Sequence, residues 1–163
     1  MGQQEQREVV NGSVTISVAV EGSGPLVVFV HGWPEISHSW RHQMAYFSAQ
    51  GYTTAALDVR GYGDSSSPHP VADYTLMNLC GDAAAVIDSF DDGPAIVVGH
   101  DWGAPIAWNT ARFHTDRVRA VAGLSVPYRP VGPVSPLEIW KAMFPDQGKF
   151  FYQAYFQHEG VAE

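Results

Sequence analysis

The sequence predicts an α/β fold, in which helices cross over between the strands of a mostly parallel β-sheet. Two continuous apolar runs, Leu26–Val30 and Ala95–Val98, have the length and β-branched content of buried strands. Each run is followed by a glycine-containing turn and then by a segment that fits a helix. Strands that alternate with helices in this way indicate crossover connections, and therefore a parallel sheet.

The expected elements begin with an antiparallel hairpin. Asn11-Gly12 separates the strands Arg7–Val10 and Val14–Glu21, and an Asn-Gly pair favours the tight turn of a hairpin. The other expected strands are Leu26–Val30, Thr53–Leu57, Ala95–Val98 and Val118–Leu124, and the expected helices are Trp40–Gln50, Leu76–Phe90 and Ala104–Phe113.

The segment that joins the fifth expected strand to the third expected helix reads Gly99-His100-Asp101-Trp102-Gly103. A small-x-nucleophile-x-small pattern at this place indicates a nucleophile elbow, and the residue at its tip is an aspartate. The two glycines provide the clearance that the strained backbone needs, and the N-terminus of the next helix favours negative charge. A carboxylate suits displacement at saturated carbon, which leaves a covalent alkyl ester for a second step to hydrolyse. Taken alone, the segment also fits an ordinary turn with an N-capping aspartate.

Two further segments with turn residues follow predicted strands. The range 31–35 (HGWPE) indicates a backbone that folds tightly over the end of its strand, and the Trp33–Pro34 bond is a candidate cis peptide. The range 58–65 (DVRGYGDS) has glycines, but their spacing matches neither a dinucleotide-binding fingerprint nor a Walker loop. We interpret this second segment as a structural loop.

In this order, HGWPE at 31–35, DVRGYGDSS at 58–66 and GHDWG at 99–103 resemble the epoxide hydrolase branch of the α/β-hydrolase fold family. Segments at 117–121, 125–128, 152–157 and 160–163 are also similar to that branch, so the likeness extends from about Val14 to the last residues. The resemblance implies an α/β-hydrolase fold, of which the chain carries the first half of the core and the start of a helical cap.

The resemblance also implies a mechanism, in which an epoxide is opened to a vicinal diol through an alkyl ester on Asp101. It makes the backbone N–H groups of Trp33 and Trp102 the oxyanion hole, and it makes Tyr152 the proton donor to the epoxide oxygen. Trp33, Pro34 and Trp102 are then expected to line an apolar substrate pocket. On composition alone, Tyr152 is also explained as one of several aromatic residues that pack within a lid helix.

A base for hydrolysis of the ester, and an acid that orients this base, are not found where the fold requires them. They follow the nucleophile in the order acid, then histidine. His114 lies at the far end of a helix about 15 Å long, and His158 has no acid in the expected order before it. We therefore expect that the chain ends before the base, the relay acid and a second lid tyrosine. Such a chain would form the ester, hydrolyse it poorly and leave the strand Val118–Leu124 on an unpaired apolar edge.

Two alternatives stay open. A haloalkane or haloacid dehalogenase uses the same aspartate nucleophile, and Trp102 could bind the halide, although Trp33-Pro34-Glu35 and a lid tyrosine favour the epoxide hydrolase. A catalytically incomplete fragment that binds an apolar ligand or a partner without turnover fits the missing base.

The proline-rich stretch Pro127–Pro136 predicts a hinge between core and cap. We therefore assign residues 1–134 to the N-terminal part of the core and residues 135–163 to the start of the cap. His38 and His42 have i, i+4 spacing but no third ligand, so neither a metal nor another cofactor is expected.

Composition restricts the partners and the compartment. The formal net charge of −8 argues against nucleic acid and anionic membrane surfaces, and the single cysteine excludes a disulfide framework. No apolar run approaches the ~20 residues of a transmembrane helix, and residues 1–7 lack the layout of a signal peptide. We expect a cytoplasmic enzyme whose partners are a small apolar epoxide and water.

Overall fold

The structure is a computed structural model that describes residues 4–130, 132–143 and 152–155. The chain divides into two compact units, Met1–Tyr128 and Arg129–Glu163. This division falls near the start of the proline-rich stretch, whereas the boundary expected from the sequence falls near its end.

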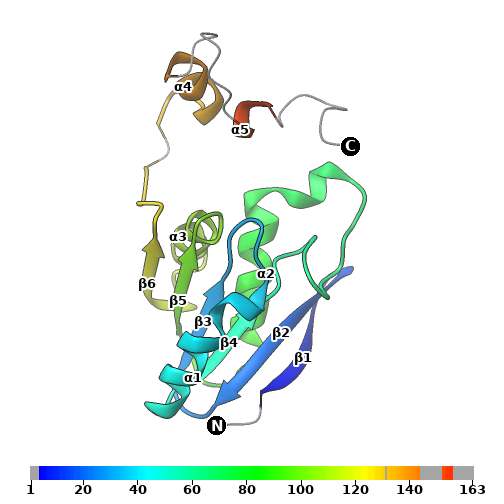
Figure 1. The fold of residues 1–163 in the computed structure, drawn as a ribbon, viewed down its shortest axis with the longest axis vertical. Coiled ribbons are helices and arrows are strands. Elements are labelled where there is room, and N and C mark those ends of the chain that lie inside the picture. Colours follow the sequence, from blue (N-terminus) through cyan, green and yellow to red (C-terminus); the bar gives the residue numbers. More distant parts are fainter. Residues whose placement is uncertain (1–3, 131, 144–151, 156–163) are drawn as a thin grey trace. The chain divides into compact units, whose positions relative to one another are not determined.

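One sheet with the strand order β1-β2-β4-β3-β5-β6 organises the first unit (Figure 1). β1 and β2 form the antiparallel hairpin predicted from Asn11-Gly12, and β2 also pairs antiparallel with β4. The pairs β4–β3, β3–β5 and β5–β6 are parallel, so the predicted mostly parallel sheet is confirmed. The strands are β1 (Glu5–Asn11), β2 (Val14–Gly22), β3 (Leu26–Val30), β4 (Thr53–Leu57), β5 (Ala95–His100) and β6 (Val118–Leu124).

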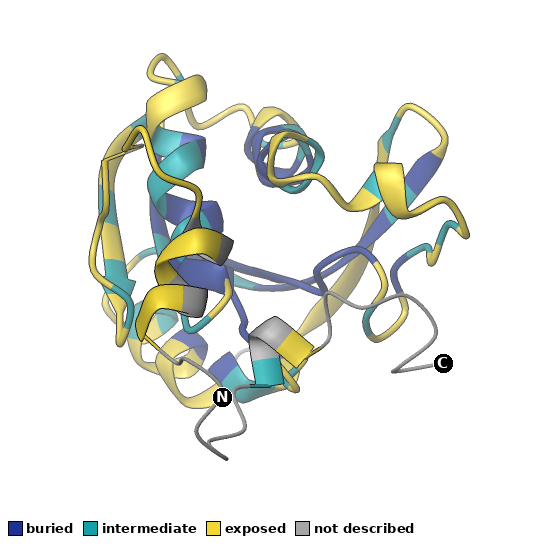
Figure 2. Ribbon diagram, turned by 90° about the horizontal axis from the view of Figure 1, so that it is seen from above, coloured by how far each residue is buried: buried dark blue, intermediate teal, exposed yellow. Residues whose placement is uncertain are grey.

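Helices lie on both faces of this sheet, and the alternation of side chains along each strand decides what each face buries. On β3, Val28 and Val30 belong to the core formed with α2 and α3, while Val27 and Phe29 pack with η1 and α1. Figure 2 shows the buried residues gathered on the central strands and on the helix sides that face them. The helices are η1 (Ser37–Trp40), α1 (Arg41–Ala49), η2 (Val71–Tyr74), α2 (Leu76–Asp88) and α3 (Gly103–Phe113).

Several element boundaries differ by one or two residues from those expected, and two of the differences follow from contacts in the structure. β5 continues two residues beyond the expected end at Val98, because Gly99 and His100 still pair with β6. The expected helix from Trp40 starts earlier, as the 3-10 turn η1, whose first backbone N–H donates to the Asp58 carboxylate at 2.7 Å. That contact joins segments far apart in the sequence, so local periodicity does not reveal it.

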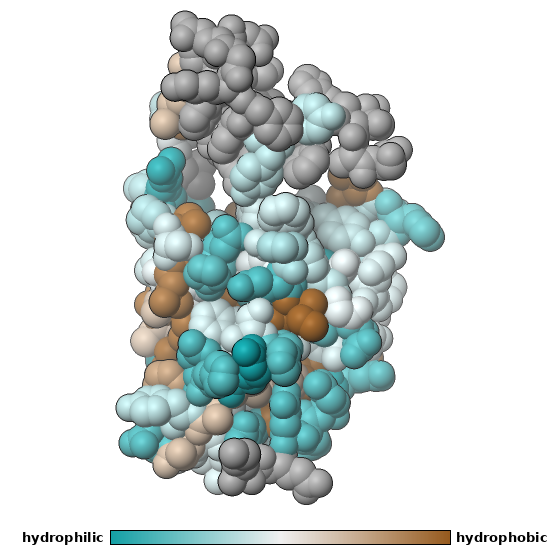
Figure 3. Space-filling model, in the orientation of Figure 1, coloured by the Kyte–Doolittle hydropathy of each residue, from teal (hydrophilic) through white to brown (hydrophobic). Residues whose placement is uncertain are grey.

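The last strand of the described sheet, β6, has an exposed apolar surface. Ala120, Ala122 and Leu124 lie on the α1 side of the sheet and are exposed, and Figure 3 shows apolar surface along the edge where Figure 1 places β6. The expected apolar edge at Val118–Leu124 is therefore present among the described residues.

The second unit contains α4 (Pro136–Met143) and α5 (Tyr152–Tyr155). α4 begins with a capping box: the Glu138 N–H donates to Ser135 Oγ at 3.2 Å, and the Ser135 N–H donates to Glu138 Oε2 at 3.0 Å. Within the described parts of both units, every helix is too short or too polar to cross a bilayer.

Candidate active site

Asp101 stands at the turn between β5 and α3 with a backbone φ of 50°, a left-handed conformation that few non-glycine residues adopt. Its glycine neighbours make this turn possible. A Cβ on Gly99 would collide with the Gly103 carbonyl, and a Cβ on Gly103 would collide with the Val30 carbonyl. The Asp101 carbonyl then accepts the Ala104 N–H at 3.1 Å, which closes the first turn of α3. These features fit the predicted nucleophile elbow, and the role of Asp101 as nucleophile stays a prediction.

The loop after β3 supplies a donor to the Asp101 carboxylate. The Trp33 backbone N–H donates to Asp101 Oδ1 at 3.0 Å, across 68 positions of sequence. The loop approaches so closely because Gly32 has no Cβ, which would otherwise collide with Asp101 Cβ. The Glu35 N–H donates to the Gly32 carbonyl at 3.0 Å, and the Trp33–Pro34 peptide bond is cis. One carboxylate oxygen is thus held by a neutral N–H donor.

His31 fixes the start of this loop, a role that the sequence did not indicate. Its Nε2 accepts the Val59 N–H at 2.9 Å, so its Nδ1 carries the proton and donates to the Gly32 carbonyl at 2.9 Å. Burial lowers the pKa of His31, more than its bond to Gly32 raises it, and so favours the neutral imidazole. His31 is thereby a structural tie between two loops, and both of its nitrogens are occupied.

The loop 58–65 is structural, as predicted. Asp58 Oδ1 accepts the Ser37 N–H at 2.7 Å, and its Oδ2 accepts the Asp64 N–H at 3.1 Å. Arg60 donates twice to the Asp82 carboxylate of α2, at 2.8 and 2.7 Å, and both side chains are buried. These bonds join the loop to η1 and α2, which supports its structural role.

Glu35, in the loop after β3, and His100, the last residue of β5, are in contact. His100 Nδ1 is 3.5 Å from Glu35 Oε2, and both side chains are partly exposed. The contact links the loop after β3 to the end of β5, the two segments that also form the Trp33 to Asp101 hydrogen bond.

A cavity of about 350 Å³ opens beside the elbow. Trp33 and Trp102 line it and are 49% and 45% exposed, whereas Pro34 lies outside the lining and its role in the pocket stays a prediction. Burial and the nearby negative charge of Asp101 raise the pKa of Tyr62, so its phenol stays protonated near neutral pH. The lining residues are His31, Gly32, Trp33, Val59, Tyr62, Tyr74, Leu76, Leu79, Trp102, Pro105 and Ile106.

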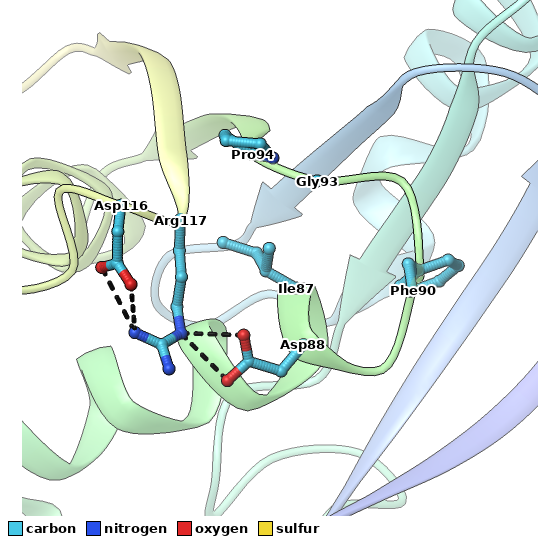
Figure 4. Close-up of a pocket in the computed structure, with 7 residues that line it drawn as sticks. All are labelled: Ile87, Asp88, Phe90, Gly93, Pro94, Asp116 and Arg117. Atoms are coloured by element: carbon cyan, nitrogen blue, oxygen red, sulfur yellow. Dashed lines mark hydrogen bonds and ion pairs between the residues drawn. The ribbon is translucent and has the colours of Figure 1, made fainter.

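A second cavity, of about 260 Å³, lies at the opposite end of the parallel strands (Figure 4). Its residues Gly93 and Pro94 precede β5 and Arg117 precedes β6, whereas Asp101 follows β5. The Arg117 guanidinium bridges the carboxylates of Asp88 and Asp116, at 2.8 and 3.1 Å, and these bonds and charges raise its pKa. Carboxylates neutralised in this way are poor nucleophiles, so this cavity is a less suitable active site.

The other predicted site residues are placed as follows. Trp102 is the N-cap of α3, and its backbone N–H as second oxyanion donor stays a prediction. Tyr152 is the first residue of α5 in the second unit, and its role as a proton donor also stays a prediction. His158 lies outside the described residues, and His114 caps the far end of α3, as expected.

Two other kinds of site find no support in the described part of the chain. It contains no group of three or more His, Cys, Asp or Glu side chains that could hold a metal ion. Burial raises the pKa of the Cys80 thiol to about 11, so this thiol stays protonated and is not a nucleophile at neutral pH.

The sheet, the elbow and the donor loop define an α/β-hydrolase. The sequence profile of the alpha/beta hydrolase fold family matches residues 25–160, and the chain belongs to that family. The predicted resemblance to epoxide hydrolases is confirmed by relatives and by solved structures. The chain is 41% identical to "Epoxide hydrolase A" of Mycobacterium tuberculosis over 165 aligned residues. The alignment covers 100% of this chain and 51% of that protein.

Two more comparisons agree. The chain is 45% identical to "Bifunctional epoxide hydrolase 2" of Sus scrofa, over 87% of this chain and 25% of that protein. A crystal structure of an epoxide hydrolase from Vigna radiata is similar with a TM-score of 0.91 and 41% identity, over 98% of this chain and 52% of that one. The chain therefore spans about half the length of the Mycobacterium and Vigna proteins, and a quarter of the Sus scrofa protein.

Proposed function

We propose that this chain carries the nucleophile-bearing half of an epoxide hydrolase, with Asp101 as the residue that bonds to the substrate. The hydrogen bond from the Trp33 N–H to Asp101 Oδ1 carries the proposal. It occupies one carboxylate oxygen and leaves the other as the atom that attacks. The names of the relatives support epoxides as the substrate class.

In the first step, the second carboxylate oxygen of Asp101 forms a bond to an epoxide carbon, and the bond from that carbon to the ring oxygen breaks. The ring oxygen leaves as an alkoxide and takes a proton, for which Tyr152 is the proposed donor. A phenol is protonated at neutral pH and is acidic enough for this task. The product of this step is an alkyl ester on Asp101.

In the second step, water adds to the carbonyl carbon of this ester, and negative charge develops on its carbonyl oxygen. That oxygen is Oδ1, which already accepts the Trp33 N–H at 3.0 Å. The donor is therefore in place where charge develops, and the Trp102 N–H is the proposed second donor. As the intermediate collapses, one water proton passes to the leaving oxygen of the diol and the other returns to the Tyr152 phenolate, so the diol is released and the carboxylate is restored.

Intact-mass spectrometry of the chain incubated with styrene oxide tests the proposal, with the diol assayed in the same samples. We expect one covalent adduct per chain and slow diol release, because His114 lies at the far end of α3 and both nitrogens of His31 are engaged in hydrogen bonds. An adduct with rapid diol release would reveal a base within the chain. Release of halide from haloalkanes without any epoxide adduct would favour the dehalogenase alternative, and binding without either reaction would favour a non-catalytic fragment.

A further inference from the structure

Trp108 of α3 lies against the end of β6. Its indole Nε1–H donates to the Val126 carbonyl at 3.0 Å, two residues beyond the end of the strand. The indole lies on the backbone of Gly123, where an added Cβ would be 2.5 Å from three of the indole atoms. The Trp108 ring also packs against the ring of Tyr128, with a centroid distance of 6.0 Å and an interplanar angle of 67°. Trp108 therefore contacts the chain both before and after the residue at which β6 ends.

The turn that follows β6 needs a restraint of this kind. β6 is the last strand of the described sheet, where it pairs with β5 on one side. Ser125, the residue after the strand, has a backbone φ of 64°, a left-handed conformation that few non-glycine residues adopt. A strained residue persists only where the surrounding structure holds it. The bond from Trp108 to Val126 holds the chain on the far side of Ser125, and the β5–β6 pairing holds it on the near side.

The same strand end holds the peptide of Asp101. The Asp101 N–H donates to the Leu124 carbonyl at 3.3 Å, and Leu124 directly precedes Ser125. The position of this carbonyl therefore depends on the turn that Trp108 restrains. Trp108 is itself on α3, the helix that begins at the elbow, so a closed path of bonds joins the elbow, the end of β6 and α3. Because all of these residues belong to Met1–Tyr128, the path is complete within one unit.

We propose that Trp108 is a positioning residue for the reaction at Asp101, and that it acts through the end of β6. Trp108 lies outside the lining of the cavity beside the elbow. Its bond to Val126 keeps the Leu124 carbonyl in place for the Asp101 N–H, and so keeps the carboxylate in one orientation. A displacement on the order of 1 Å at a reacting group can reduce the rate about 10²-fold. This inference rests on the proposed function, to which it adds a residue outside the cavity.

Trp108→Phe tests the proposal, because it keeps an aromatic ring and removes the N–H donor. Trp40→Phe is the matched control, since Trp40 is buried and its indole N–H has no hydrogen-bond partner among the described residues. The same substitution there reduces the ring volume and removes no hydrogen bond. Intact mass measures the rate constant of ester formation on Asp101 at saturating styrene oxide, together with the half-saturating concentration.

We expect the rate constant at saturation to fall at least about tenfold in Trp108→Phe. The half-saturating concentration should stay within about twofold of the wild-type value, because the cavity lining is unchanged. Trp40→Phe should keep both wild-type values. An unchanged rate constant in Trp108→Phe would overturn the positioning role. Equal falls in the two variants would also overturn it, because they would show a loss of packing and not of the hydrogen bond.

Hydrogen exchange judges the link from Trp108 to Asp101 even if no epoxide reacts, a result that would remove the proposed function by itself. Exchange of the Asp101 N–H, followed by NMR, should be at least about tenfold faster in Trp108→Phe than in the wild-type chain, and unchanged in Trp40→Phe. Unchanged exchange of this N–H in Trp108→Phe would overturn the link.

The wild-type chain provides a further check that needs no variant to fold. The indole N–H of Trp108 donates to a carbonyl, whereas Trp102 is exposed. We expect the Trp108 indole N–H to exchange with solvent more slowly than the Trp102 indole N–H. Equally fast exchange of the two groups would show that the bond to Val126 is absent, and would overturn the proposal.

Discussion

Each end of the parallel strands has a cavity and at least one carboxylate near it, and the surroundings of these carboxylates differ. At the amino end, Asp88 and Asp116 share the Arg117 guanidinium (Figure 4). At the carboxyl end, Asp101 accepts a neutral N–H from Trp33, and its neighbours Trp33 and Trp102 line an apolar cavity. A cation neutralises a carboxylate, whereas a neutral donor orients it and leaves its charge available for attack.

The two ends also differ in backbone strain and in the exposure of their ion pairs. Asp101 has a φ of 50° and is surrounded by glycines that make room for it, so strain is present where the reactive atom has to project. At the amino end the ion pairs are partly exposed and connect the end of α2 to the start of β6. Exposed pairs of this kind contribute little to stability.

Asp101→Asn should have the largest effect. An amide is not a nucleophile at saturated carbon, so the rate of adduct formation with styrene oxide should fall by at least about 10³-fold. Intact mass measures this rate. Asp88→Asn, at the other cavity, is the control and should react like the wild-type chain. Equal losses of adduct formation rate in Asp101→Asn and Asp88→Asn would contradict the distinction between the two ends.

Asp82→Ala should have the next largest effect, on stability. It leaves Arg60 buried without its carboxylate partner, and breaking a buried pair by removing one member costs about 3–5 kcal/mol. The free energy of unfolding, from urea denaturation, measures this cost. Asp88→Ala removes a carboxylate from an exposed pair and should change that free energy little. A small loss in Asp82→Ala would contradict the structural role given to the loop 58–65.

Gly32→Ala should displace the nucleophile without removing it. The added Cβ would overlap Asp101 Cβ, and a displacement on the order of 1 Å at a reacting group can reduce the rate about 10²-fold. The rate of adduct formation is the measurement. Gly81→Ala on α2 is the matched control, because its Cβ would meet only Asn11 Nδ2 at 3.6 Å. We expect the control to keep the wild-type rate, and a normal rate in Gly32→Ala would contradict the close approach of the two loops.

The free energy of unfolding should depend on pH through His31, and this effect should be smaller than those of the preceding variants. Burial lowers the pKa of His31 in the folded chain, so below about pH 6.5 the unfolded chain binds the proton more readily. The free energy of unfolding should therefore be highest above about pH 6.5 and should fall as the pH decreases, by at most about 1.4 kcal/mol per pH unit from this group.

Urea denaturation between pH 5 and 8 measures that slope. His31→Asn should show a flatter profile than the wild-type chain, because it removes the group whose pKa is lowered on folding. A wild-type slope in His31→Asn would contradict the buried, neutral imidazole.

The sequence predicted the features that depend on local patterns. The bounds of β3, β4 and β6 agree with the expected ranges, and β3 is a continuous apolar run. The elbow was predicted because its two glycines and Asp101 lie within five consecutive residues, and the left-handed φ of Asp101 supports this prediction.

What the sequence did not predict depends on contacts between distant segments. The place of β4 between β2 and β3, the bond from Val59 to His31 and the cavity wall at Leu76 and Leu79 all join residues separated by many positions. The end of β5 was missed for the same reason, since Gly99 and His100 are held in the strand by β6. Periodicity along one segment carries no information about such partners.

Tandem mass spectrometry of the peptides from styrene oxide-treated chain tests the central claim most directly, because it locates the modified atom. The account predicts an ester on the side chain of Asp101 in the wild-type protein, with Asp88 and Asp116 unmodified. Modification spread over those two carboxylates, or found on His100 with Asp101 intact, would contradict it.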